Sequence, residues 1–141
     1  MILFLDTSSL VKLYVEESGA DSVRRLVAGA SRIAVSVVAY PEARSAFARR
    51  RREGALNARG LRTARAAFER DWTRMVRLAV TEDVYRAAGS LAERHGLRAL
   101  DGLQLASFLS LRTRLPRRGV KFSSFDRRLE RVAPRARWPD A

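Results

Sequence analysis

Four carboxylates in this sequence stand where strands should end or helices should begin. Asp6 and Asp126 each follow a short apolar run, and Glu42 and Asp101 stand near the beginnings of helix-like stretches. In an open α/β sheet, functional side chains gather at the carboxyl ends of the strands. Carboxylate oxygens suit Mg²⁺ or Mn²⁺, and several carboxylates can hold one or two such ions against a phosphodiester. The pattern therefore points to metal-assisted phosphodiester hydrolysis.

Each of the four acids also has a structural explanation. Asp6 and Asp101 can cap helices, an interaction worth about 1 kcal/mol each. Glu42 can interact favourably with its helix dipole, and Asp126 can open the last helix. Glu42 and Asp101 are flanked by apolar residues, however, and a carboxylate in such surroundings is costly unless it is paired or binds a metal. Taken together, the four acids favour a functional role.

The composition excludes several other chemistries. The chain has no cysteine, which removes disulfides, thiolate metal sites and cysteine nucleophiles. Its one histidine, His95, leaves almost nothing for a zinc site made of His and Cys. No G-x-S-x-G motif presents a serine nucleophile. A metal that lowers the pKa of its bound water needs no histidine base, which matches what the composition offers.

The charge is strongly basic and unevenly distributed. Lys and Arg number 28 against 15 Asp and Glu, for a net charge of +13, and the excess lies in residues 44–77 and 112–137. Two basic blocks indicate a surface that binds a polyanion such as nucleic acid. A compositional bias toward arginine is the simpler alternative, but it does not explain the excess of bases over acids.

The elements that must position the acids alternate between strands and helices. Apolar runs predict strands at residues 2–5, 33–36, 76–80 and 120–123. Helical periodicity and end signals predict helices at 8–17, 20–28, 37–52, 57–74, 81–94, 101–111 and 127–132. Such alternation predicts an α/β fold with a parallel central sheet and helices on both faces. At 141 residues we expect a single domain, with prolines near the end that predict a loose tail over 133–141.

Nothing in the sequence predicts export or membrane insertion. No apolar stretch reaches the ~18 residues that a membrane-spanning helix needs. The apolar run at residues 2–5 ends at Asp6, which is too short for a signal peptide and lacks a basic flank. We therefore expect a cytoplasmic protein.

Four stretches of the chain resemble motifs of PIN-domain nucleases, above all the VapC toxins of VapBC toxin–antitoxin pairs. They are FLDTSSLVKLY at 4–14, SVVAYPEARSA at 36–46, LRALDGLQLA at 97–106 and FSSFDRRL at 122–129. The resemblance spans residues 1–132 in the order and spacing of the family. Two positions depart from the commonest pattern, because Pro41 precedes Glu42 and Ser124 replaces the usual threonine. None of the four acids is lost.

The resemblance implies a PIN-like three-layer fold and a metal-dependent endoribonuclease that acts as a toxin. It implies that four acids are catalytic and hold Mg²⁺ or Mn²⁺, namely Asp6, Glu42, Asp101 and Asp126. It also implies that two hydroxyls orient a carboxylate or a metal-bound water, namely Ser8 and Ser124. The implied partners are an RNA substrate, a VapB-like antitoxin that occludes the site, and a second copy of the chain in a homodimer.

Three arginines on the predicted helix that carries Glu42 are candidate RNA contacts, namely Arg44, Arg49 and Arg50. The alternative function is a non-catalytic basic module that binds RNA or DNA, in which the acids are structural caps scattered through the fold. Such a module would show salt-sensitive binding without metal-dependent turnover. A phosphatase of the haloacid-dehalogenase type is disfavoured, because the position of its second acid is Ser8 here.

Overall fold

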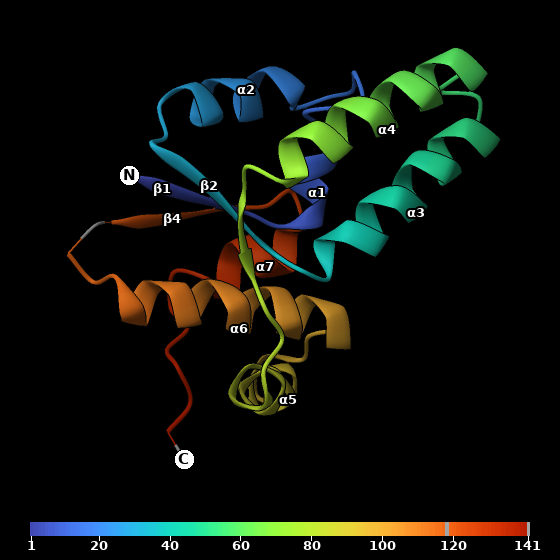
Figure 1. Cartoon of the computed structure of the whole chain (residues 1–141). Helices are drawn as coiled ribbons and strands as arrows, with labels where there is room; N and C mark the ends of the chain where they lie inside the picture. The colour runs from blue at the N-terminus through green and yellow to red at the C-terminus, as the bar shows by residue number, and fades with distance from the viewer. Residues whose placement is uncertain (118, 141) are drawn as a thin grey trace.

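A parallel four-stranded sheet forms the centre of the computed structural model, which describes residues 1–117 and 119–140 (Figure 1). The strands are β1 (Ile2–Leu5), β2 (Arg32–Ser36), β3 (Val76–Leu78) and β4 (Val120–Ser123). Their order in the sheet is β3-β2-β1-β4, and each neighbouring pair is parallel. The carboxyl ends of the strands therefore share one edge of the sheet, as the sequence predicted.

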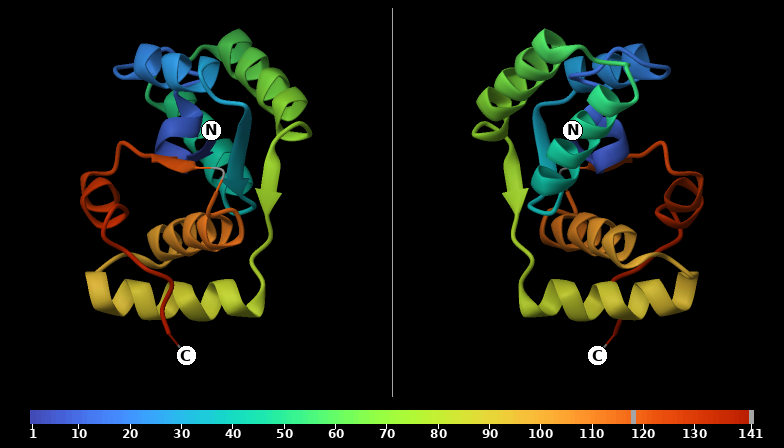
Figure 2. Two further views of the ribbon diagram at one scale, coloured as in Figure 1. Left: turned by 90° about the vertical axis from the view of Figure 1, so that its left-hand side faces the viewer. Right: turned by 90° about the vertical axis from the view of Figure 1, so that its right-hand side faces the viewer.

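Helices cover both faces of the sheet (Figures 1 and 2). The helices are α1 (Thr7–Val11), α2 (Ala20–Ala28), α3 (Ala39–Arg52), α4 (Ala58–Trp72), α5 (Glu82–His95), α6 (Ala99–Arg114) and α7 (Arg127–Val132). The first four of them contribute buried residues to one core, and the last three contribute to the other. This is the three-layer α/β architecture that we expected.

The central strand β1 supplies side chains to both cores. All four of its residues are buried, and successive side chains of a strand point to opposite faces. Ile2 and Phe4 accordingly lie in the core shared with α5, α6 and α7, whereas Leu3 and Leu5 lie in the core shared with α1 to α4. A continuous apolar run is what a strand buried on both faces requires.

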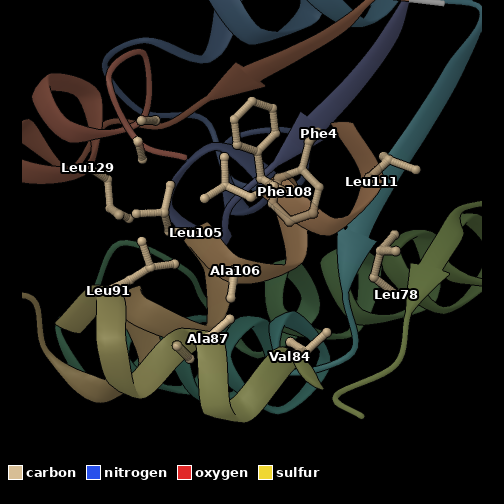
Figure 3. Packing of buried hydrophobic residues seen from close by; sticks show 14 of the residues in the cluster. Phe4, Leu78, Val84, Ala87, Leu91, Leu105, Ala106, Phe108, Leu111 and Leu129 are labelled. Atoms are coloured by element: carbon tan, nitrogen blue, oxygen red, sulfur yellow. The ribbon is translucent and has the colours of Figure 1, made fainter. Parts of the chain in front are cut away.

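Helix α6 packs between the sheet and α5, and this packing fixes the position of the end of α6 that carries Asp101. Figure 3 shows Phe108 packed near Phe4, and their ring centroids are 5.9 Å apart. On its other side α6 approaches α5 so closely that a Cβ on Gly102 would lie 2.8 Å from the carbonyl oxygen of Ala88. Only glycine fits at residue 102 without a shift, so the residue after Asp101 sets the spacing of the two helices.

Two stretches differ from the sequence-based expectations. The helix expected at 8–17 ends at Val11, and the chain continues in turns whose Tyr14 hydroxyl donates to Asp71 at 2.9 Å. The loose tail expected over 133–141 is wrong for its described part, because Ala133 and Ala136 are buried. Arg112 donates a hydrogen bond to the carbonyl oxygen of Ala136 at 2.7 Å, which ties this segment to α6.

The remaining strands and helices begin and end within a few residues of their predicted positions. Within residues 1–117 and 119–140, no helix combines the length and the apolar character that a bilayer crossing requires.

Candidate active site

The four acids that the sequence singled out line one cavity of about 640 Å³ at the carboxyl edge of the sheet. Asp6 directly follows β1, and Glu42 lies in the first turn of α3, which follows β2. Asp101 lies in the first turn of α6, and Asp126 directly follows β4. Four segments far apart in the chain thus bring one acid each to this cavity, which we call the acidic cavity.

Asp6 is the most buried of these acids, with only 3% of its surface exposed. Its carboxylate accepts hydrogen bonds from the hydroxyls of Ser8 and Ser124 and from the backbone N–H of Ser9. Burial nevertheless outweighs these bonds and raises the pKa of Asp6 from 3.8 to about 6, with a smaller contribution from the negative charge of Asp126. The carboxyl of Asp6 in the metal-free protein therefore binds its proton more tightly than an exposed aspartate does.

The two serines that donate to Asp6 are themselves oriented by the backbone of the segment after β4. The backbone N–H of Phe125 donates to Ser8 Oγ at 2.8 Å, and that of Asp126 donates to Ser124 Oγ at 3.0 Å. Because each hydroxyl oxygen already accepts a bond, its own hydrogen is directed to the carboxylate of Asp6. This hydrogen-bond network connects the segment after β1 to the segment after β4.

Glu42 is held by a different pair of side chains. Its Oε1 accepts a hydrogen bond from Thr7 Oγ1 at 2.9 Å and another from Gln104 Nε2 at 3.0 Å. Gln104 Nε2 also lies 3.0 Å from Thr7 Oγ1, so the three side chains form a closed triangle. Thr7 and Gln104 are functional candidates that the sequence reasoning missed, although both lie inside the quoted motifs.

The side-chain amide of Gln104 lowers the stability of the fold, because one of its polar atoms is buried without a partner among the described residues. Gln104 is only 2% exposed, and among the described residues its Oε1 has no hydrogen-bond partner. A buried acceptor without a partner costs about 1–3 kcal/mol. A polar residue three positions after Asp101 on an otherwise apolar helix was the available sequence signal, because i and i+3 share a helix face.

Asp101 and Asp126 also line the acidic cavity and interact electrostatically. Burial is the main cause that raises the pKa of Asp101, and the negative charges of Asp126 and Glu42 add to it. Arg98 and Arg128 partly oppose this rise, and Arg98 Nε lies 3.6 Å from Asp101 Oδ2. The acids therefore interact electrostatically across one cavity, and a bound cation would relieve their mutual repulsion.

The capping roles considered from the sequence are partly present. Asp6 accepts from the N–H of Ser9 as the N-cap of α1, and Asp126 accepts from the N–H of Leu129 as the N-cap of α7. Asp101 caps no helix, because Arg98 occupies the N-cap position of α6. Asp6 and Asp126 therefore cap a helix and line the cavity at the same time. A capping role does not explain the presence of Asp101.

The donor set suits a hydrated hard cation. Over residues 1–117 and 119–140, no three acidic or histidine side chains are gathered closely enough to hold one ion between them. Mg²⁺ commonly binds through one or two carboxylates and keeps several waters, and the acidic cavity has room for such waters. Carboxylate and hydroxyl oxygens without any thiolate match the same class of ion.

The three arginines predicted to contact RNA have different surroundings. Arg49 is exposed on the wall of the acidic cavity. Arg50 also lines it, but its guanidinium donates to both carboxylate oxygens of Glu17. Arg44 lines a neighbouring cavity of about 470 Å³ and is paired with Glu69 at 3.0 Å. RNA contact by these arginines stays a prediction.

Comparison with known proteins gives consistent results at two levels. The family model described as the PIN domain matches residues 3–134. Ribonuclease VapC45 and Ribonuclease VapC49, from two strains of Mycobacterium tuberculosis, are each 33% identical to this chain. Each comparison covers 94% of this chain and 95% of the relative.

Solved structures share the fold at low sequence identity. VapC20 of Mycobacterium tuberculosis, described as a toxin that cleaves the sarcin–ricin loop, has a TM-score of 0.63 and 18% identity, and covers 92% of this chain and 94% of its own. FitAcB of Neisseria gonorrhoeae has a TM-score of 0.61 and 19% identity, and the match covers 95% of this chain and 94% of the FitAcB chain. VapBC2 of Rickettsia felis, solved with a promoter DNA fragment, has a TM-score of 0.58 and 14% identity. The match covers 88% of this chain and 100% of the VapBC2 chain. The PIN-like fold expected from the motifs is confirmed.

Proposed function

This chain belongs to the PIN-domain family, and from that premise we propose that it is a metal-dependent endoribonuclease and the toxin of a type II toxin–antitoxin pair. The observation that carries the proposal is the gathering of Asp6, Glu42, Asp101 and Asp126 on one cavity wall in an otherwise basic chain. The ribonuclease names of the relatives at 33% identity support the activity.

In the proposed reaction the four acids would together hold a hydrated Mg²⁺ or Mn²⁺, one or two of them as direct ligands and the others through its waters. When bound, such an ion supplies a water of lowered pKa and neutralises charge on the phosphate. Ser8 and Ser124 keep the carboxylate of Asp6 in a fixed orientation, and Thr7 and Gln104 do the same for Glu42. Fixed carboxylates hold the site near its working geometry without reorganisation during the reaction.

The partners follow from the same proposal. The substrate is RNA, and the basic character of the chain favours binding to its phosphates. A VapB-like antitoxin occludes the acidic cavity, the toxin forms a homodimer, and both act in the cytoplasm. The names of the VapC and VapBC relatives support the antitoxin part of this proposal.

Cleavage of total bacterial RNA by the purified chain tests the activity. We expect cleavage with Mg²⁺ or Mn²⁺, none with EDTA, and none with Asp101→Asn. Asp83→Asn is the matched control, because Asp83 is an exposed carboxylate in the first turn of α5 and does not line the acidic cavity. Cleavage that persists in EDTA or in Asp101→Asn would rule out the proposed mechanism.

A non-catalytic module that binds RNA or DNA is the second candidate. The capping roles of Asp6 and Asp126 favour it, because those roles would hold the two acids in place without any catalysis. This candidate predicts salt-sensitive binding with no cleavage under any metal, so the same assay separates the two functions.

A further inference from the structure

A second cavity, lined mainly by arginine, adjoins the acidic cavity. Its volume is about 350 Å³, and we call it the arginine cavity. The lining residues are Arg98, Asp101, Asp126, Arg127, Arg128 and Arg131. Arg98, Asp101 and Asp126 also line the acidic cavity, so the two cavities share a wall.

The described residues that line the arginine cavity carry more positive than negative charge. Four guanidinium groups face two carboxylates there. Arg98 is 84% exposed and has only a long contact with Asp101, and Arg128 donates to the backbone carbonyl of Gly96. In the part of the chain that the structure describes, Arg127 and Arg131 form no ion pair with a carboxylate.

Three arginines elsewhere on the surface contrast with this set, whereas others such as Arg49 and Arg59 form no ion pair among the described residues either. What distinguishes Arg127 and Arg131 is that they line a cavity that shares a wall with the acidic cavity. Arg24 is paired with Glu16 and Asp21, Arg44 with Glu69, and Arg50 with Glu17. Those guanidinium groups are already occupied by acids of the chain, whereas the exposed groups of Arg127 and Arg131 are open to an external anion. The two residues stand at i and i+4 on α7 and so share one face of that helix.

We propose that the arginine cavity binds a backbone phosphate of the RNA strand next to the one positioned in the acidic cavity. Guanidinium groups present planar forks of N–H donors that match phosphate oxygens. A strand whose scissile phosphate lies beside Asp101 and Asp126 passes the shared wall, where Arg127, Arg131 and Arg98 neutralise the neighbouring phosphate. This inference rests on the proposed function, since it takes RNA as the substrate.

The salt dependence of RNA binding tests the arginine cavity without any turnover. The probe is a short fluorescein-labelled single-stranded RNA, and its anisotropy is titrated with full-length protein in EDTA at several NaCl concentrations. The test variant is Arg127→Ala/Arg131→Ala. The control is Arg25→Ala/Arg94→Ala, which removes the same charge from exposed positions on α2 and α5 that lie outside both basic blocks and line neither cavity.

We expect the test variant to bind RNA more weakly and to lower the slope of log K against log salt by about 1.4, which is two contacts at ~0.7 each for a single strand. The control should keep the slope of the unsubstituted protein. Equal slopes in the test variant and the control, or no RNA binding by the unsubstituted protein, would overturn the proposal. Poly-L-glutamate is titrated in parallel, and selective loss of its binding with RNA binding intact would assign the cavity to an acidic protein segment instead.

Failure of the arginine-cavity proposal can be distinguished from failure of the nuclease proposal. A reduced slope in the test variant, with no cleavage by the unsubstituted protein under any metal, would leave the arginine cavity as an RNA site and reject the enzyme. Metal-dependent cleavage together with an unchanged slope would keep the enzyme and reject the arginine cavity.

Discussion

Gln104 Nε2 donates a hydrogen bond to Glu42 Oε1 over 3.0 Å, and the bond joins helices from opposite layers of the fold. Glu42 lies on α3, which packs on one face of the sheet, and Gln104 lies on α6, which packs on the other. Side chains of the two helices meet at the edge of the sheet where the acidic cavity lies. The acidic cavity is thus assembled where both layers contribute side chains.

Replacement Gln104→Met should lower cleavage and leave the fold intact. Methionine removes the donor to Glu42 but also removes the unpaired Oε1, so the free energy of unfolding should change by only about 1 kcal/mol. Loss of a group that orients a metal-binding carboxylate typically costs about 10–100-fold in activity. Rates of RNA cleavage and urea unfolding curves measure the two effects separately.

Ser107→Ala is the matched control for that variant. Ser107 lies on the same helix, is fully buried, and has a hydroxyl without a partner among the described residues, but it does not line the acidic cavity. Its removal should leave the cleavage rate unchanged. Equal activity of Gln104→Met and Ser107→Ala would show that the bond to Glu42 has no role in the reaction.

Ser124→Ala should weaken metal binding at neutral pH. The Ser124 hydroxyl lowers the pKa of Asp6, so its loss should raise that pKa and favour the protonated carboxyl, which binds cations poorly. We expect the Mn²⁺ affinity near pH 7 to fall about 10-fold, with recovery at higher pH. Ser124→Thr keeps the hydroxyl and should behave as the unsubstituted protein, whereas an equal loss in both variants would contradict the role of the hydrogen bond.

Asp6 should make the metal-free protein less stable as the pH rises. The pKa of Asp6 is raised from 3.8 to about 6 in the folded protein, so the folded state binds a proton more tightly than the unfolded state. The resulting stabilisation is complete below pH 3.8 and is lost as the pH rises through 6, and it amounts to about 3 kcal/mol.

Urea unfolding in EDTA across this pH range measures the effect. Asp6→Asn should reduce the change in the free energy of unfolding between low and high pH, because the amide does not ionise. Asp83→Asn should retain the pH dependence of the unsubstituted protein. The same pH dependence in Asp6→Asn and in the unsubstituted protein would assign it to other groups.

Spacing along the chain was enough to predict that Asp6 and Asp126 lie near each other. Parallel strands place their carboxyl ends at one edge, so residues that directly follow β1 and β4 had to lie near each other. The apolar run at β1 and the nearly uniform apolar character of α6 likewise predicted burial, and both are buried.

Tertiary contacts account for what the sequence did not predict. Pairing of Gln104 with Glu42 depends on how α3 and α6 meet beyond the sheet, which no local pattern encodes. Residues 133–140 were expected to be loose because of Pro134 and Pro139, but the burial of Ala136 against α6 outweighs that local signal. Charge counting could not distinguish Arg50, which is bound by Glu17, from Arg127 and Arg131, which are open at the surface.

Direct titration with Mn²⁺ is the sharpest test of the central proposal that the four acids hold a catalytic cation. Electron paramagnetic resonance counts the free ion, and RNA cleavage is followed on the same samples. We predict that the unsubstituted protein binds Mn²⁺, that Asp6→Asn and Asp101→Asn each weaken binding at least about 10-fold, and that cleavage falls in parallel. Full Mn²⁺ affinity in both variants, or cleavage by protein that binds no Mn²⁺, would contradict it.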